Sequence, residues 1–302
     1  MEVEDIKNSA FSIDGDIFFD HSIKNLNWFN IGEKTKILFK PHSLEGLIKY
    51  LKLYAMRGKI FILGNGSNVL FDDETYPGTV IKLGKSFSKI TLLDKETIIA
   101  GTAVTQKKVS EFAMKNNISG LEFMSCIPGS IGGGIRMNSG CFNREFKDIL
   151  ISIQIVDFKG IVRSIPAHKI KFNYRSIELP HDLIFLSATF RGKEKNNLEI
   201  NDTMKVLKHK KELAQPSKIK TGGSTFKNPI NQTDKKVWEL IRSSISIKKT
   251  YGDAAISEKH ANFFVNKNSA KFKDMETLIN FVRDEVKKKT GIELELEIVV
   301  VK

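Results

Sequence analysis

Residues 121–142, LEFMSCIPGSIGGGIRMNSGCF, combine closely spaced glycines with apolar residues. A flexible Gly/Ser linker would be polar throughout, so this stretch is predicted to belong to a folded domain. Glycine has no Cβ, so a glycine-rich backbone can approach a ligand closely, and its N–H groups can bind phosphate. The stretch therefore indicates a phosphate-binding segment.

A second glycine-rich loop lies upstream. Residues 60–70, IFILGNGSNVL, run from an apolar strand into the loop 64–68. Two such loops favour a ligand with two phosphates or with two anchored ends, which points to a dinucleotide. Gly64 and Gly66 begin like a Rossmann fingerprint, but the third glycine is missing and strand-like sequence follows, which argues against a classical nicotinamide site.

The composition favours a cytoplasmic protein. The 302 residues are enough for two or three domains, and 41% are hydrophobic. No apolar run is long enough to span a membrane, and the polar N-terminus MEVEDIKNSA is not a signal peptide. Cys126 and Cys141 lack metal-binding or redox spacing, so we interpret them as small buried residues and expect no metal.

The net charge of +13 raises nucleic-acid binding as an alternative. Of the 48 basic residues, 8 are arginines, which leaves 40 lysines spread along the whole chain. Proteins that bind nucleic acid use arginine for paired contacts to bases and phosphates. We therefore favour a solvated lysine surface over a nucleic-acid site, and attraction of an anionic substrate stays open.

Helices and strands alternate without a strict βαβ rhythm, which predicts an α+β fold. Ser43 and Thr105 are predicted to cap helices, and the polar segment 191–202 is predicted to be a domain boundary. Strands are predicted at 35–41, 59–63, 79–83, 90–93, 97–100, 150–157, 161–165, 183–190, 262–266 and 292–301. Further helices are predicted at about 202–213, 234–242 and 274–289, and a glycine-rich loop at 221–229.

Three further motifs contain residue types that can carry chemistry. They are FNYR at 172–175, TGGSTFKNP at 221–229 and GIELELEI at 291–298. Taken alone, Arg175 could be a surface ion-pair partner and Ser224 a turn residue. The alternating glutamates could be the solvent face of an edge strand.

Together these motifs resemble the UDP-N-acetylenolpyruvoylglucosamine reductase (UDP-N-acetylmuramate dehydrogenase) family over roughly residues 25–300. The short interval between Arg175 and Ser224 resembles the compact type that lacks an extra tyrosine loop. The resemblance rests on nine motifs in order: 27–32 NWFNIG, 63–68 LGNGSN, 120–123 GLEF, 127–133 IPGSIGG, 137–140 MNSG, 174–175 YR, 223–229 GSTFKNP, 259–263 KHANF and 294–297 LELE.

The resemblance implies a vanillyl-alcohol-oxidase-like FAD-binding fold of two subdomains, 1–84 and 85–198, with a smaller α+β substrate domain at 199–302. It implies non-covalent FAD as cofactor, NADPH as co-substrate and the enolpyruvyl ether of UDP-N-acetylglucosamine as substrate. We expect a monomer that binds neither nucleic acid nor membrane. The FAD contacts that it implies are Gly64, Asn65, Gly66, Ser67, Asn68, Pro128, Gly129, Ser130, Gly133, Gly134, Asn138 and Gly140.

The resemblance also implies the roles of the catalytic residues. Flavin N5 would give hydride to the substrate, Arg175 and Glu297 would stabilise the resulting enolate, and Ser224 would donate the proton. Lys227 and Asn228 would contact the substrate. The rival on the same scaffold is another FAD oxidoreductase, such as a sugar or lactone oxidase.

The sequence departs from the family pattern at two informative positions. Trp28 stands where a small hydroxyl residue is usual, and Leu296 replaces the usual proline between Glu295 and Glu297. The strand period of two puts both glutamates on one face, so the choice between them stays open.

Overall fold

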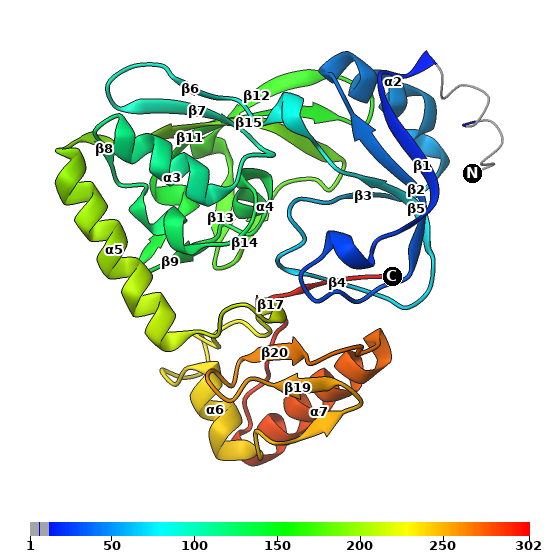
Figure 1. The fold of residues 1–302 in the computed structure, drawn as a ribbon, viewed down its shortest axis with the longest axis vertical. Helices are drawn as coiled ribbons and strands as arrows, with labels where there is room; N and C mark the ends of the chain where they lie inside the picture. The colour runs from blue at the N-terminus through cyan, green and yellow to red at the C-terminus, as the bar shows by residue number, and fades with distance from the viewer. Residues whose placement is uncertain (1–5, 7–11) are drawn as a thin grey trace. The chain divides into compact units, whose positions relative to one another are not determined.

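The computed structural model describes Ile6 and residues 12–302. Helices and strands are mixed along the chain, which confirms the α+β class (Figure 1). The chain divides into two compact units, while the predicted three-domain division stays a prediction. Unit 1 comprises the chain up to His21 with Lys36–Asn65 and Pro77–Lys211, and unit 2 comprises Ser22–Thr35, Gly66–Tyr76 and Glu212–Lys302.

The first sheet of unit 1 has four strands in the order β1-β2-β5-β3. Strands β3 and β5 run parallel, so their carboxyl ends lie at the same edge of the sheet. The strands are β1 (Gly15–Ser22), β2 (Lys34–Pro41), β3 (Ile60–Ile62) and β5 (Tyr76–Ile81).

Helix α2 (Leu44–Tyr54) packs on this sheet. The hydroxyl of Ser43 accepts a hydrogen bond from the Gly46 N–H at 3.1 Å, so the predicted N-cap is confirmed. The ring of Tyr50 stacks on Phe39 of β2 with 4.2 Å between ring centroids. This buried apolar face anchors the helix to the sheet.

The second sheet of unit 1 is antiparallel, with the order β12-β11-β15-β7-β6. Its central strand, β15, is buried along most of its length. The strands are β6 (Ile90–Leu92), β7 (Thr97–Gly101), β11 (Leu150–Asp157), β12 (Val162–Pro166) and β15 (Leu183–Arg191).

Helix α3 (Gln106–Lys115) also belongs to unit 1. The hydroxyl of Thr105 accepts from the Lys108 N–H at 3.3 Å, which confirms the second predicted cap. Three short antiparallel pairs are β8 (Ile118–Ser119) with β16 (Lys193–Glu194), β9 (Gly140–Cys141) with β10 (Arg144–Glu145), and β13 (Lys171–Asn173) with β14 (Ser176–Glu178). Unit 1 also contains α4 (Ile131–Arg136) and most of α5 (Asn197–Ala214), which ends in unit 2. The 3-10 turns of unit 1 lie at Ala55–Arg57, Lys85–Phe87, Glu122–Cys126, Phe146–Asp148 and Ala167–Lys169, and one at Lys24–Leu26 lies in unit 2.

Unit 2 is built on a four-stranded antiparallel sheet with the order β17-β20-β19-β18. Helices α6 (Val237–Ser244) and α7 (Phe272–Thr290) pack against each other and share its core (Figure 1). The strands are β17 (Lys220–Ser224), β18 (Thr250–Tyr251), β19 (Ala254–Ile256) and β20 (Phe263–Asn266).

A separate parallel pair joins β4 (Val69–Phe71) to β21 (Val299–Val301) within unit 2. Helix α7 ends where Gly291 adopts a left-handed conformation, with φ of 73°. Among the described residues, no helix has both the length and the apolar character that a membrane crossing requires.

Three local predictions are wrong. The central glycine segment contains helix α4, because Ser130 caps it and its apolar residues are buried. The predicted loop at 221–229 begins as strand β17. The predicted strand at 292–301 forms a regular strand at β21 alone. The residues before β21 make one isolated bridge, from Leu296 to Phe226. Strands β1 and β4 were not predicted, and α5 begins inside the predicted boundary segment.

Candidate functional site

The two glycine-rich segments meet within unit 1 at Gly64 and Ser130. Strand β3 is followed by Leu63 and then by Gly64. The Leu63 N–H donates to the Ile81 carbonyl at the end of β5. A Cβ placed on Gly64 would lie 2.4 Å from Ser130 Oγ, closer than real Cβ contacts. The sequence therefore needs glycine here to bring the two segments together. Ligands of sheets with parallel strands commonly bind beyond such carboxyl ends.

Two neighbouring glycines of α4 face different surroundings. A Cβ on Gly134 would lie 2.5 Å from the ring of Phe146, so internal packing explains this glycine. A Cβ on Gly133 would meet only Ser130 Oγ, at an ordinary 3.6 Å. Glycine in a helix is about 1 kcal/mol less favourable than alanine, so no contact within the described residues explains Gly133. Its bare backbone fits close approach by a ligand.

Asn138 shapes the end of this segment from within. Its side chain is buried, its Nδ2 donates to the Asn173 carbonyl at 3.0 Å and to Glu145 Oε2 at 3.1 Å, and its Oδ1 accepts from the Lys147 N–H at 3.1 Å. These bonds occupy the amide inside the protein. Any contact from Asn138 to a cofactor would therefore come from its backbone.

The other predicted cofactor residues of this segment lie beside it. Gly129 has a positive φ of 125°, and its carbonyl accepts from the Gln106 N–H at 3.0 Å. A Cβ on Gly140 would lie 2.2 Å from the Arg144 carbonyl across the β9–β10 pair. Glycine at both positions is thus explained by backbone conformation or close packing.

Arg175 lies at the tip of the β13–β14 hairpin in a left-handed conformation, with φ of 59°. Its Nη2 donates to the Gly140 carbonyl at 3.0 Å, and its Nη1 lies 3.6 Å from Glu145 Oε1. The guanidinium also lies over the ring of Tyr174, 4.8 Å from the ring centroid. The predicted catalytic arginine is therefore held against the glycine-rich segment of unit 1. Glu145, which the sequence analysis missed, carries no motif that could have singled it out.

The cysteines match their predicted role as packed residues. Cys126 is buried and Cys141 is half-buried, and neither forms a disulfide. Burial raises the pKa of the Cys141 thiol to about 12, with a smaller contribution from Cys126. A thiol with such a pKa is not a nucleophile at neutral pH.

Within unit 2, the loop 66–68 is held by two backbone segments. Gly66 is left-handed with φ of 65°, and a Cβ there would lie 2.2 Å from the Leu26 carbonyl. Its own carbonyl accepts from the Trp28 N–H at 3.0 Å. The Nδ2 of Asn68 donates to the Glu297 carbonyl at 2.9 Å, so this predicted cofactor residue also fixes the C-terminal segment. Ser67, between them, is half-buried.

Ser224 ends strand β17, opposite Phe263 of β20, and the chain beyond it is fixed by Asn262. The buried amide of Asn262 accepts from the Phe226 N–H at 3.0 Å and donates to the Phe226 carbonyl at 2.8 Å. Both polar backbone groups of Phe226 are satisfied in this way. Asn262 lies in the KHANF motif, which was the available signal, although the sequence analysis gave it no role.

The isolated bridge between Phe226 and Leu296 sets the C-terminal glutamates beside this segment. The Glu297 N–H donates to the Thr225 carbonyl at 2.9 Å, and the Lys227 N–H donates to the Glu295 carbonyl at 2.8 Å. The Lys227 ammonium lies 2.6 Å from Glu295 Oε1. Glu295 is thus exposed and paired with lysine, whereas Glu297 is half-buried.

Asn228 is placed differently from its neighbour Lys227. Its Oδ1 accepts from the Val237 N–H at 3.1 Å, so it helps to start helix α6. Unit 2 thus brings together Ser224, Lys227 and Glu297, while Asn228 uses its oxygen within the fold.

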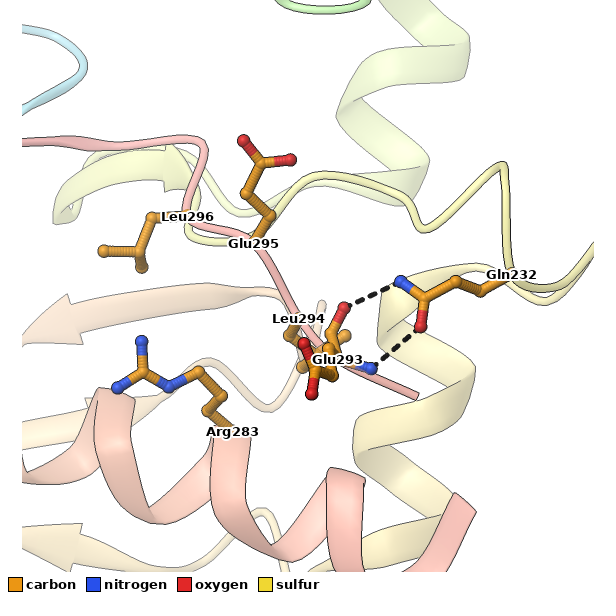
Figure 2. A pocket seen from close by; sticks show the side chains of 6 residues that line it. All are labelled: Gln232, Arg283, Glu293, Leu294, Glu295 and Leu296. Atoms are coloured by element: carbon orange, nitrogen blue, oxygen red, sulfur yellow. Dashed lines mark hydrogen bonds between the residues drawn. The ribbon is translucent and has the colours of Figure 1, made fainter. Parts of the chain in front are cut away.

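An open pocket lies beside the segment that contains these glutamates (Figure 2). The side chain of Gln232 pairs with the backbone of Glu293 through two hydrogen bonds of 3.0 Å. The lining residues are Gln232, Arg283, Glu293, Leu294, Glu295 and Leu296. Glu297 is not among them, although its neighbours Glu295 and Leu296 are.

Comparisons with known proteins cover the whole chain. Residues 35–165 match the FAD binding domain family, and residues 215–301 match the UDP-N-acetylenolpyruvoylglucosamine reductase C-terminal domain family. The chain is 56% identical to a UDP-N-acetylenolpyruvoylglucosamine reductase of Pelagibacter ubique over 302 residues, covering 100% of both proteins. It is 39% identical to the enzyme of that name from Rickettsia bellii, covering 95% of this chain and 94% of the relative.

The fold agrees with a solved structure. The crystal structure of UDP-N-acetylenolpyruvylglucosamine reductase (MurB) from Thermus caldophilus matches with a TM-score of 0.81 and 28% identity, covering 95% of this chain and 99% of that one. The predicted vanillyl-alcohol-oxidase-like FAD-binding fold with a smaller C-terminal α+β domain is confirmed. The chain is therefore an FAD-dependent oxidoreductase and belongs to the UDP-N-acetylenolpyruvoylglucosamine reductase family.

Proposed function

We propose that this protein uses NADPH to reduce the enolpyruvyl ether of UDP-N-acetylglucosamine to UDP-N-acetylmuramate, a step in peptidoglycan precursor synthesis. The observation that carries the proposal is the placement of Arg175. Its guanidinium is bonded to the Gly140 carbonyl of the glycine-rich segment and is mostly withdrawn from water. An always-charged group in such a place is suited to stabilising a carboxylate-linked enolate.

The residues present fit FAD, because Gly133 offers bare backbone that internal packing does not require. When bound, FAD would supply hydride through N5 after reduction by NADPH. We propose that the pyrophosphate contacts come from the loop 64–68 and from Pro128, Gly129, Ser130 and Gly133. The remaining predicted residues, Gly134, Asn138 and Gly140, would support the backbone that makes these contacts.

The protein's own residues would then carry the proton and the charge. Hydride addition at the vinyl carbon leaves negative charge on the adjacent carbon and its carboxylate, which the Arg175 guanidinium would stabilise. Ser224 would donate its hydroxyl proton to that adjacent carbon, since an enolate carbon is basic enough to accept it. Together, these steps reduce the substrate and protonate the enolate.

Glu297 rather than Glu295 is proposed as the second stabilising group. Glu295 is exposed and its carboxylate is paired with Lys227, whereas Glu297 is half-buried. Glu297 can assist only when it, or a group bonded to it, donates a hydrogen bond to the enolate. Lys227 and Asn228 are proposed to contact the substrate, and the cytoplasmic location and monomeric state stay predictions.

The test is the visible absorption spectrum of the purified protein without oxygen. One equivalent of NADPH should bleach the flavin band, and one equivalent of the enolpyruvyl UDP-sugar should restore it. A band that bleaches but does not return would support the assignment as a flavoenzyme and rule out the proposed substrate. It would favour another FAD oxidoreductase. No band after FAD addition, with salt-sensitive DNA binding, would reject the proposal and favour the nucleic-acid alternative.

A further inference from the structure

Lys82 is a lysine that neither the sequence motifs nor the proposed mechanism uses. It directly follows strand β5, at the sheet edge where the parallel strand β3 also ends. Its N–H donates to the Phe39 carbonyl at 2.9 Å, which fixes the start of the side chain. Its Nζ donates to the Gly64 carbonyl at 2.5 Å. The ammonium group thus contacts the glycine-rich loop 64–68.

The charge of Lys82 has no counter-charge in the described part of the chain. The carbonyl of Gly64 is the one acceptor that its ammonium contacts there, and no carboxylate lies within ion-pair distance. Burial, and to a lesser extent the like charge of Lys40, lowers the pKa of Lys82 below its ordinary value. A partly buried cation without an anion is unfavourable, so the free protein holds positive charge that a bound anion would compensate.

The position of this charge identifies the class of anion. Lys82 contacts the Gly64 carbonyl, and Gly64 lies against Ser130, so the ammonium is bonded to the residue at which both glycine-rich segments meet. We propose that Lys82 binds the diphosphate of FAD and supplies positive charge that the glycine backbone lacks. This inference rests on the proposed FAD site. Lysine serves well as a point charge for phosphate, and charge-assisted hydrogen bonds are stronger than neutral ones.

The competing explanation is that Lys82 only holds the Gly64 loop in place. The two explanations differ in which ligands they affect. If Lys82 contacts the diphosphate, its replacement weakens the binding of FAD but not of riboflavin, which has no phosphate. If Lys82 only supports the loop, its replacement weakens the binding of both ligands alike, because both need the loop.

The experiment titrates FAD and riboflavin into flavin-free protein and follows quenching of flavin fluorescence. Lys82→Met should weaken FAD binding about 10- to 100-fold and flatten its dependence on salt, while riboflavin binding changes less than about twofold. Lys82→Arg should retain most of the FAD affinity. Lys40→Met is the matched control, because Lys40 lies nearby but its ammonium is over the ring of Phe18.

Three results would count against the inference. Equal weakening of FAD and riboflavin would assign Lys82 to loop support, and unchanged FAD affinity would remove it from the site. Loss of FAD affinity with a lowered melting temperature of the flavin-free variant would also indicate a structural role, because removing an uncompensated buried charge should not destabilise the protein. Failure of the unchanged protein to bind FAD would instead reject the proposed function itself.

Discussion

The guanidinium of Arg175 and the carboxylate of Glu145 lie 3.6 Å apart, and both side chains are less than one-fifth exposed. Glu145 also contacts the Lys147 ammonium at 2.8 Å and the Asn138 amide at 3.1 Å. The Glu145 carboxylate is shared among Arg175, Lys147 and Asn138. It therefore holds the Arg175 guanidinium in place without fully neutralising the guanidinium charge. Arg175 is thereby fixed at a hairpin tip while keeping the capacity to bind a carboxylate.

Arg175→Lys should not behave as a conservative change. A lysine cannot reproduce the planar pair of donors, so reoxidation of the reduced flavin by the UDP-sugar should slow about 10²–10³-fold. FAD content and flavin reduction by NADPH should be unchanged. Rapid-mixing absorbance separates the two half-reactions. A turnover within a few fold of the original would make Arg175 a structural ion-pair partner only.

Ser224→Ala should affect the same half-reaction through the proton. Loss of one positioned transition-state group predicts a slowdown of about 10²–10³-fold or more, with flavin reduction nearly intact. Ser243→Ala is the control, because that hydroxyl donates to the Leu240 carbonyl within α6. Normal turnover of Ser224→Ala would remove this serine from the mechanism.

Gly133→Ala should change stability and flavin affinity in opposite directions. The new methyl would make only an ordinary contact with Ser130 Oγ, at 3.6 Å, so helix propensity should stabilise the flavin-free protein by up to about 1 kcal/mol, while FAD binding weakens. Gly134→Ala should instead destabilise, because its Cβ would lie 2.5 Å from Phe146. Thermal unfolding and FAD titration of both variants provide the comparison. Undiminished FAD affinity in Gly133→Ala would mean that this backbone faces away from the cofactor.

Asn262→Ala should destabilise the protein by about 2–5 kcal/mol, since it leaves two buried backbone groups of Phe226 without partners. Denaturant unfolding measures the loss. Asn268→Ala, at an exposed position of the same unit, should change stability by less than about 0.5 kcal/mol. A similar small effect at Asn262 would show that water replaces its hydrogen bonds.

His260 should make stability depend on pH on the acidic side. Burial, with the charge of Arg242, lowers its pKa in the folded protein, while its Nδ1 accepts from the Asn262 N–H at 3.3 Å. The unfolded chain therefore binds the proton first as the pH falls below about 6.5, and folded stability decreases until the lowered pKa is passed. His260→Gln should remove this part of the pH dependence. Equal slopes for both proteins in unfolding series between pH 7 and pH 5 would contradict the assignment.

Local signals in the sequence predicted local structure well. Ser43 and Thr105 cap their helices as expected, because a cap depends only on residues three positions away. The helix at residues 131–136 was missed, because glycine disfavours helices in isolation and only the surrounding core makes this one stable.

The site was predictable as a set of residues but not as an arrangement. Sequence alone does not distinguish Gly133, where a Cβ would fit without a clash, from Gly134, where a Cβ would lie against the Phe146 ring. Lys82 contacts Gly64, and Lys227 pairs with Glu295. Both contacts join residues that are distant in the chain. Such contacts depend on the tertiary fold, so residue patterns carry no direct signal for them.

The parallel pair of β4 and β21 has a consequence for how the protein is made. Asn68 and Glu297, which flank this pair, are separated by 229 positions along the chain. The ribosome releases the N-terminal residues long before it adds the last ones, and early domains begin to fold during translation. Gly66 bonds to the nearby Trp28 N–H, but Asn68 cannot reach the Glu297 carbonyl until the segment that leads into β21 has been made. Completion of this loop is therefore a late event in the synthesis of the chain, although the loop itself is made early.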